Sequence, residues 1–200
     1  MAGLIGVFGG TFDPPHLGHL ILAESGRQAL GLDKVQWVVT AQPPHKPNEN
    51  RTPVELRLEM VAAAIQGNEA FEISRVDVDR PPPHYAVDTL RLLAAARPDA
   101  SFAYLLGEDS LRDLPVWHRP QQLVQACDVF GVMERSGAEP DLADLEKVLP
   151  GLSARVRFFR APIIDIASRD LRRRVLAGES IRYLVPEGVE QIIRRDGLYR

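Results

Sequence analysis

Short apolar runs alternate along this chain with longer segments in which apolar residues recur every three or four positions. A short run bounded by turn residues is typical of a buried strand, whereas the longer period indicates an amphipathic helix. The pattern predicts strands at 4–8, 35–40, 71–76, 101–106, 128–132 and 155–159. It predicts helices at 17–30, 53–65, 85–97, 119–126, 142–149, 168–177 and 186–195.

This alternation favours an α/β fold with a mostly parallel sheet and helices on both faces. Right-handed crossovers bring the carboxyl ends of parallel strands to one edge, where ligands bind near the point at which the strand order reverses. We expect the turn after the first strand to lie there. Proline-rich or polar stretches at 43–48, 81–83 and 136–140 are predicted loops. Because no repeat or linker interrupts the pattern, 1–200 is expected to form a single domain.

Composition indicates the general class of the protein but does not indicate which reaction it catalyses. With 45% hydrophobic and 26% charged residues, the chain resembles an ordinary globular protein. A formal net charge of −3 gives no global basic field, so we expect no nucleic acid partner. The single Cys127 excludes an intrachain disulfide, and no apolar run reaches the roughly 18–20 residues of a membrane span. We therefore expect no membrane partner, no secretory signal and a cytoplasmic location.

The turn after the first strand carries the strongest chemical signal. Gly9 and Gly10 permit positive φ and close approach of a ligand to the backbone, although a simple tight turn explains them equally well. His16 and His19 stand three residues apart at the start of a predicted helix, so they share one face beside N–H groups that the helix leaves unpaired. Such a cluster of donors suits a polyphosphate. The alternatives are surface or capping histidines, or a zinc pair, for which no further ligands are obvious.

A family resemblance resolves this choice. The run Gly9-Gly10-Thr11-Phe12-Asp13-Pro14 followed by His16-Leu17-Gly18-His19 resembles the signature of the nucleotidylyltransferase superfamily with the H-x-G-H motif. The resemblance implies a Rossmann-like sheet that binds a nucleoside triphosphate over this turn. Further stretches are similar to those of bacterial nicotinate-nucleotide adenylyltransferases, with Ala86 where threonine is usual: Pro43–Lys46, Tyr85–Leu90, Gly107–Leu111 with Trp117, and Gly197–Tyr199.

One motif departs from the superfamily pattern. In the segment 166–172, Ser168 and Arg172 match, but Arg169 occupies the usual threonine position. We expect Ser168 to cap the helix that starts here, with its N–H groups aimed at phosphate. Arg169 either adds a cation to the phosphate site or points outward, and Arg173 and Arg174 are interpreted as a solvated helix face. The helices from about residue 166 onward are expected to pack at the ATP site.

The resemblance implies an enzyme that transfers AMP from ATP to nicotinate mononucleotide, giving deamido-NAD and pyrophosphate. Mg²⁺ would be bound through the ATP phosphates, with no direct protein ligand. The implied catalytic residues are His16, His19 and Lys46. The implied ATP-binding residues are Gly9, Gly10, Thr11, Phe12, His16, His19, Gly107, Asp109, Ser168, Arg169 and Arg172. The implied nicotinate mononucleotide-binding residues are Thr11, His45, Lys46, Tyr85, Asp88, Thr89 and Trp117.

Several of these residues also have plainer interpretations. Trp117 stacks on an aromatic ligand or anchors the core, whereas Trp37 lies inside a strand pattern and is assigned to the core. Asp88 and Thr89 begin a helix whose free N–H groups suit a carboxylate. Asp109 either accepts a hydrogen bond from a ribose hydroxyl or caps a helix.

Three further residues are not assigned to the site, and other functions also fit part of the pattern. Cys127 is expected to be a buried structural thiol, and His84 and His118 are left out of the catalytic set. Rival functions are another H-x-G-H enzyme, such as pantetheine-phosphate adenylyltransferase or a cytidylyltransferase, and a nucleotide sensor without turnover. The protein is expected to be a monomer or a homodimer.

Overall fold

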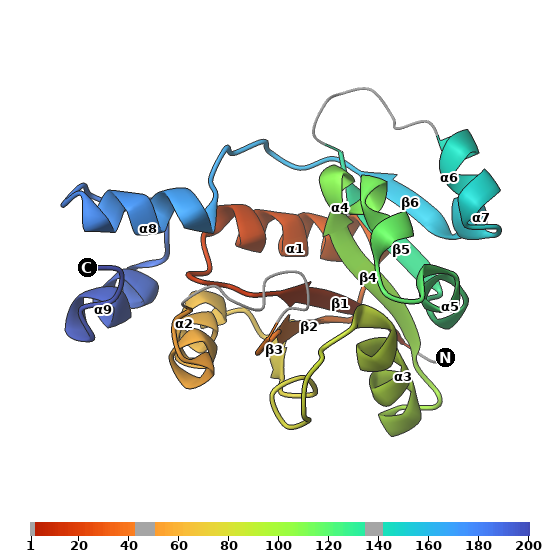
Figure 1. Cartoon of the computed structure of the whole chain (residues 1–200), viewed down its shortest axis with the longest axis horizontal. Coiled ribbons are helices and arrows are strands. Elements are labelled where there is room, and N and C mark those ends of the chain that lie inside the picture. The colour runs from red at the N-terminus through yellow and green to blue at the C-terminus, as the bar shows by residue number, and fades with distance from the viewer. Residues whose placement is uncertain (1–2, 43–50, 135–141) are drawn as a thin grey trace.

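The computed structural model describes residues 3–42, 51–134 and 142–200, and its central element is a parallel sheet. Its strands lie in the order β3-β2-β1-β4-β5-β6, and every neighbouring pair is parallel (Figure 1). The predicted Rossmann-like α/β fold is therefore confirmed. The strand bounds are β1 (Leu4–Gly10), β2 (Lys34–Val39), β3 (Phe71–Ser74), β4 (Ser101–Gly107), β5 (Val129–Met133) and β6 (Val156–Phe159).

The predicted helices are present, with ends that shift by a few residues. Three short elements were not predicted, namely α4, the 3-10 helix η1 and α7, because each has five residues or fewer and shows no helical period. The bounds are α1 (Leu17–Leu30), α2 (Val54–Ile65), α3 (Ala86–Ala96), α4 (Glu108–Arg112), η1 (Leu114–Val116), α5 (Pro120–Ala126), α6 (Leu142–Val148), α7 (Leu152–Arg155), α8 (Ser168–Leu176) and α9 (Glu187–Arg195).

Apolar side chains cover both faces of the sheet, as predicted. One face packs on α1 and α2, and its core contains Trp37, which is 0% exposed. The other face packs on α3, α4, α5 and α7. Cys127 lies in this second core, where its thiol donates to the Val129 carbonyl at 3.0 Å and burial raises its pKa to about 12. It is the structural thiol that the sequence indicated. Within the described ranges, no helix is long and apolar enough to cross a membrane.

The strand order places the first turn at the switch point of the sheet. β1 pairs with β2 on one side and with β4 on the other. The strands that follow β1 in the chain, β2 and β3, therefore lie on one side of it, and β4, β5 and β6 lie on the other side. A crevice forms beyond the carboxyl ends of strands at such a point. The residues after Gly10 therefore lie at the ligand-binding edge, as the alternation of elements predicted.

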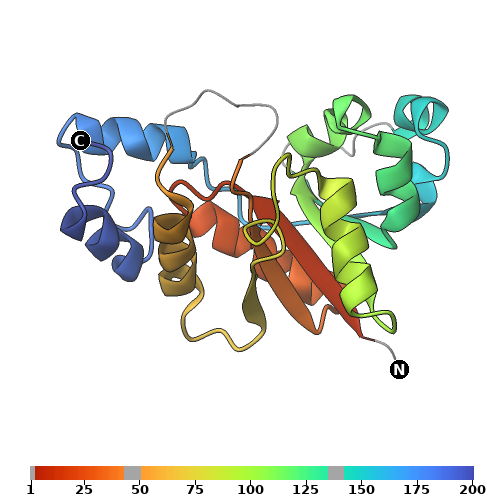
Figure 2. The same ribbon diagram turned by 60° about the horizontal axis from the view of Figure 1, so that its bottom comes forward.

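The C-terminal helices pack on α2 and reach the first turn. In Figure 2 the blue helices α8 and α9 lie beside the orange α2 and away from the green α5. Leu171 of α8 and Val189 of α9 share an apolar cluster with Met60 of α2. The expectation that Ser168 caps α8 is wrong, because the N-cap is Ala167. The Ser168 hydroxyl instead donates to the Pro14 carbonyl of the first turn, at 2.9 Å.

Candidate active site at the switch point

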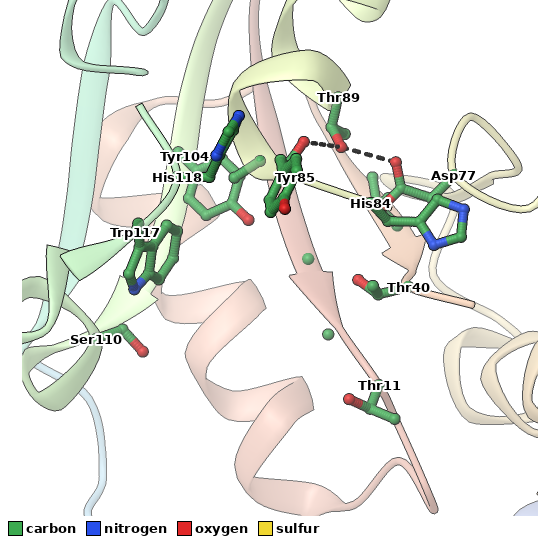
Figure 3. A pocket seen from close by; sticks show the side chains of 14 residues that line it. Thr11, Thr40, Asp77, His84, Tyr85, Thr89, Tyr104, Ser110, Trp117 and His118 are labelled. Carbon is green, nitrogen blue, oxygen red and sulfur yellow. Dashed lines mark hydrogen bonds between the residues drawn. The ribbon is translucent and has the colours of Figure 1, made fainter. Parts of the chain in front are cut away.

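Two adjoining cavities lie at the carboxyl edge of the sheet. The first cavity has a volume of about 300 Å³ and is bounded mainly by β1, the end of β2 and the start of α3 (Figure 3). The second cavity has a volume of about 230 Å³ and lies between β1, α1 and the end of β4. Both cavities are lined by the same five residues where they meet: Gly9, Gly10, Tyr104, Ser110 and Trp117.

Many of the residues singled out in the sequence line these cavities. Thr11, Tyr85 and Thr89 line the first cavity. Phe12, His19, Gly107 and Asp109 line the second. Trp117 lines both and also packs against the core on that face of the sheet, so both of its interpretations hold. His45 and Lys46 fall outside the described residues. The remaining candidates line neither cavity: His16, Asp88, Ser168, Arg169 and Arg172.

The two glycines are required by close packing and not by their dihedral angles. Neither Gly9 nor Gly10 has positive φ, so that part of the expectation is wrong. A Cβ on Gly9 would lie 2.7 Å from the Tyr104 hydroxyl, and one on Gly10 would lie 2.8 Å from the Phe12 ring. Both distances are shorter than a van der Waals contact. Glycine at these positions therefore lets the Tyr104 hydroxyl and the Phe12 ring pack directly against the end of β1.

The paired histidines are stacked at the start of α1. Their rings lie 3.6 Å apart with an interplanar angle of 24°. His16 is the N-cap residue, and its backbone N–H donates to Nδ1 of His19 at 3.1 Å. His16 is only 6% exposed, whereas His19 lines the second cavity. Of the pair, His19 is therefore the ring that reaches a cavity, and the stacked ring of His16 packs against it.

This arrangement determines how His19 carries its proton. Burial and the neighbouring His16 charge lower the pKa of His19 well below its usual value of 6.5, so the ring is neutral at pH 7. Because Nδ1 accepts a hydrogen bond, the proton of the neutral ring is on Nε2. His19 is thus an uncharged ring, held at Nδ1, whose Nε2–H can donate.

The amides at the start of α1 are less available than the sequence suggested. The Leu17 N–H donates to the Leu184 carbonyl at 3.1 Å, and the His19 N–H donates to the His16 carbonyl at 2.9 Å. Of the first three helix amides, only that of Gly18 has no partner among the described residues. The expectation of a cluster of free N–H groups is therefore wrong for two of these three amides.

The start of α3 differs in a similar way from its prediction. The amides of Asp88 and Thr89 both donate to the Tyr85 carbonyl, at 3.1 Å each. The two amides before them, on Ala86 and Val87, have no partner within the described part of the chain, but Val87 is 0% exposed, so the Ala86 amide is the one that a carboxylate could reach. Ala86 itself lines the first cavity.

The inner wall of the first cavity contains a satisfied ionic network that the sequence did not reveal. Asp77 is buried, accepts a 2.7 Å hydrogen bond from the Thr89 hydroxyl and pairs with Arg80 at 2.9 Å (Figure 3). His84 accepts from the Gln42 N–H at 3.1 Å through Nδ1, and its Nε2 lies 3.2 Å from the Arg80 carbonyl. Asp77 and His84 therefore hold the wall together.

An aromatic group borders the same cavity. His118 stacks on Tyr85 with ring centroids 3.8 Å apart and an interplanar angle of 17°. In Figure 3 this pair and Thr11 lie at opposite ends of the cavity, with Trp117 to one side. An aromatic ring near one end and a polar turn at the other are suited to a mononucleotide. The sequence gave His118 no role, and its position next to Trp117 was the only available signal.

Arg57 is a second residue that the sequence did not single out. It lies on α2, is 1% exposed, and within the described residues its guanidinium donates to four backbone carbonyls. The acceptors lie in three chain segments. They are the carbonyls of Thr11 after β1 (2.8 Å), of Thr40 and Ala41 after β2 (2.8 and 2.9 Å), and of Thr52 before α2 (3.0 Å). A guanidinium carries enough donors in a rigid plane to join several chain segments. Arg57 thus fixes the polar end of the first cavity.

Comparisons with known proteins agree with this geometry. The family model described as cytidylyltransferase-like matches residues 7–174. A probable nicotinate-nucleotide adenylyltransferase of Thermomicrobium roseum is 48% identical over 196 residues, which cover 98% of this chain and 91% of the relative. A protein of the same name from Salinibacter ruber is 43% identical over 98% of this chain and 97% of its own.

A solved structure shares the fold. It is the nicotinic acid mononucleotide adenylyltransferase of Plasmodium falciparum, complexed with NaAD, and it superposes with a TM-score of 0.79. The match covers 98% of this chain and 97% of that one at 19% sequence identity.

Proposed function

The chain belongs to the family of nicotinate-nucleotide adenylyltransferases, and from this premise we propose that its two adjoining cavities hold the two substrates of one adenylyl transfer. The reaction joins the AMP part of ATP to nicotinate mononucleotide, giving deamido-NAD and pyrophosphate. The observation that carries the assignment is the common wall of the two cavities at Gly9 and Gly10. Two substrates bound on either side of this wall would meet over the end of β1.

The transfer needs no nucleophile from the protein. A phosphate oxygen of nicotinate mononucleotide attacks the α-phosphorus of ATP and forms the new phosphoanhydride bond. The bond from the α-phosphorus to the oxygen that bridges to the β-phosphorus breaks, and pyrophosphate leaves with that electron pair. The protein's task is to align two polyanions and to stabilise the charge that develops between them.

The first cavity suits nicotinate mononucleotide. With the phosphate near Thr11, the pyridine ring reaches the end of the cavity where Tyr85 and His118 stack, with Trp117 beside it. The free amide of Ala86 at the start of α3 then faces the nicotinate carboxylate. The polar turn and the aromatic end thus match the two ends of this substrate.

The second cavity suits the adenosine part of ATP, and His19 would donate from Nε2 to the phosphates. Gly107 is the last residue of β4, and its lack of a side chain leaves room for a ligand. The exposed Asp109 at the start of α4 is placed to accept a hydrogen bond from a ribose hydroxyl. A neutral donor at His19 stabilises developing negative charge without having to give up a proton. His16 acts on the reaction through the ring of His19. The roles of His45, Lys46 and Arg169 remain predictions from the resemblance.

The side chains present fit a cation that arrives with the nucleotide. Within the described ranges no three His, Cys, Asp or Glu residues converge, whereas Mg²⁺ in nucleotide enzymes keeps several waters and binds mainly to substrate phosphates. When bound, Mg²⁺ would neutralise charge on the triphosphate. Asp109 is the carboxylate that lines the second cavity, so it is the residue placed to hold a water of such an ion.

An acceptor panel tests the function and separates its rivals. The protein is mixed with Mg²⁺ and either ATP or CTP, and with nicotinate mononucleotide, nicotinamide mononucleotide or phosphopantetheine. Pyrophosphate and dinucleotide are then quantified. We expect the highest kcat/KM for ATP with nicotinate mononucleotide. A preference for phosphopantetheine or CTP would assign the chain to another H-x-G-H activity, and nucleotide binding without pyrophosphate release would identify a sensor.

A further inference from the structure

Tyr104 occupies a special place in the common wall of the two cavities. It lies on β4, opposite Val7 of β1, and its hydroxyl points toward the end of β1 (Figure 3). That hydroxyl would lie 2.7 Å from a Cβ on Gly9, so the missing side chain of Gly9 makes room for it. The ring meets Trp117 edge-on, with centroids 6.2 Å apart and an interplanar angle of 78°. Packing on both sides therefore fixes the direction of the hydroxyl.

The Tyr104 hydroxyl has no hydrogen-bond partner among the described residues. The residue is only 8% exposed but lines both cavities, so its hydroxyl faces the space that a ligand would occupy. A hydroxyl in such a place usually pairs with a ligand or with water. Burial and the charge of Asp77 both raise the pKa of Tyr104, which keeps the phenol protonated and able to donate.

The reacting atoms must lie beside this hydroxyl if the two substrates bind as proposed. The attacking phosphate oxygen belongs to the occupant of the first cavity, and the α-phosphorus belongs to the occupant of the second. They can approach bonding distance only at the common wall. Of the five residues that line both cavities, Gly9 and Gly10 have no side chain, and Trp117 offers only an indole N–H.

We infer that Tyr104 is a catalytic residue whose hydroxyl donates a hydrogen bond to a non-bridging oxygen of the phosphoryl group in transfer. This inference rests on the proposed function, since it needs both substrates in place. A protonated phenol suits this position, because it adds a donor to a crowded anionic centre without adding a charge. Ser110 is the other hydroxyl in the common wall, and it provides the comparison.

The test is Tyr104→Phe, which removes one oxygen and leaves the ring packed against Trp117. We expect kcat with ATP and nicotinate mononucleotide to fall about 10- to 100-fold, the range typical of one hydrogen bond to a charged group, while both KM values stay within about twofold. Thermal unfolding checks that the variant remains folded. The matched control is Tyr183→Phe, because Tyr183 is 79% exposed and lines neither cavity. It should match wild type.

The outcomes distinguish this inference from the proposed function. An inactive wild type in the acceptor panel would refute the function itself. An active wild type with an unchanged Tyr104→Phe variant would refute only the role of Tyr104. A rise in KM for one substrate at constant kcat would also overturn it, because the hydroxyl would then bind that substrate equally in the ground and transition states. A further Ser110→Ala variant shows whether the second hydroxyl contributes independently.

Discussion

Replacing Arg57 by methionine would test whether one buried cation holds the ends of β1 and β2 in place. Methionine matches the length and apolar character of the arginine stem but has no donors. The substitution would leave the carbonyls of Thr11, Thr40, Ala41 and Thr52 without the guanidinium that binds them at 2.8 to 3.0 Å. It would also remove the positive charge that faces the buried Asp13.

The contacts set the expected magnitude. A net contribution of about 1.5–3 kcal/mol for each hydrogen bond to a charged group would sum to about 6–12 kcal/mol for four. That sum is an upper limit, because the adjoining first cavity is open and water can enter to bind some of the carbonyls. We therefore expect a loss of about 3–5 kcal/mol in the free energy of unfolding, as for breaking a buried charge network. A domain with about 5–15 kcal/mol of stability would remain folded.

Equilibrium unfolding in urea measures this loss. With a slope of about 2 kcal/mol per molar urea, the midpoint should fall by about 1.5–2.5 M. Arg57→Lys should lie between the wild type and Arg57→Met, because one ammonium cannot reach all the segments that the guanidinium joins. The control is Arg91→Met, where an exposed arginine loses one hydrogen bond to Gln122 and stability should change by less than about 0.5 kcal/mol. A loss below about 1 kcal/mol in Arg57→Met would refute the reasoning.

Three other predictions concern the first turn. His19→Ala should lower kcat about 10²- to 10³-fold in steady-state assays, because it removes a preorganised donor, and activity within twofold of wild type would refute that role. The pKa of His19 in the folded protein lies below the unfolded value of 6.5, so this residue should lower folding stability as the pH drops from 6.5 toward the folded pKa, and should cost nothing above pH 6.5. The urea midpoints of the wild type at pH 7.5 and 5.5 should therefore differ more than those of His19→Gln. An equal difference in the two proteins would contradict this prediction. Gly9→Ala should lower the free energy of unfolding in urea by about 1–3 kcal/mol, because the new methyl group would collide with the Tyr104 hydroxyl. The loss should be smaller when Tyr104→Phe has already removed that hydroxyl. If the effects of the two substitutions simply add, the collision does not occur.

The parts of the fold that the sequence predicted are those with a clear period. The six strands and the longer helices bury one or both faces, so their apolar residues repeat at a regular spacing. α4 and α7 have five and four residues, which is hardly more than one turn, so no repeat could show. Alternation of strands and helices predicted a parallel sheet, but the strand order came only from the structure, because several topologies satisfy the same alternation.

The site was predicted in part, and the misses share one cause. The spacing of His16 and His19 predicted a shared face, and the rings are indeed stacked. The spacing could not show that Leu184, far along the chain, would occupy the Leu17 amide. Nor could it show that Tyr104, at a position that reads as core, would turn its hydroxyl to the gap above Gly9. Contacts between distant segments decide these points, and a local pattern does not contain them.

The C-terminal segment illustrates how a residue can belong to an active site without lining it. The carbonyls of Asp13 and Pro14 are turned inward in a buried turn and need donors, because unpaired buried carbonyls destabilise a fold. Arg172 donates to the first at 2.7 Å and Ser168 to the second at 2.9 Å, and Tyr199 donates to the Asp13 carboxylate at 2.6 Å. α8 and the residues after α9 therefore hold the turn that leads into α1 and His19. The substitution of Arg169 for threonine lies beside these two donors but leaves both in place.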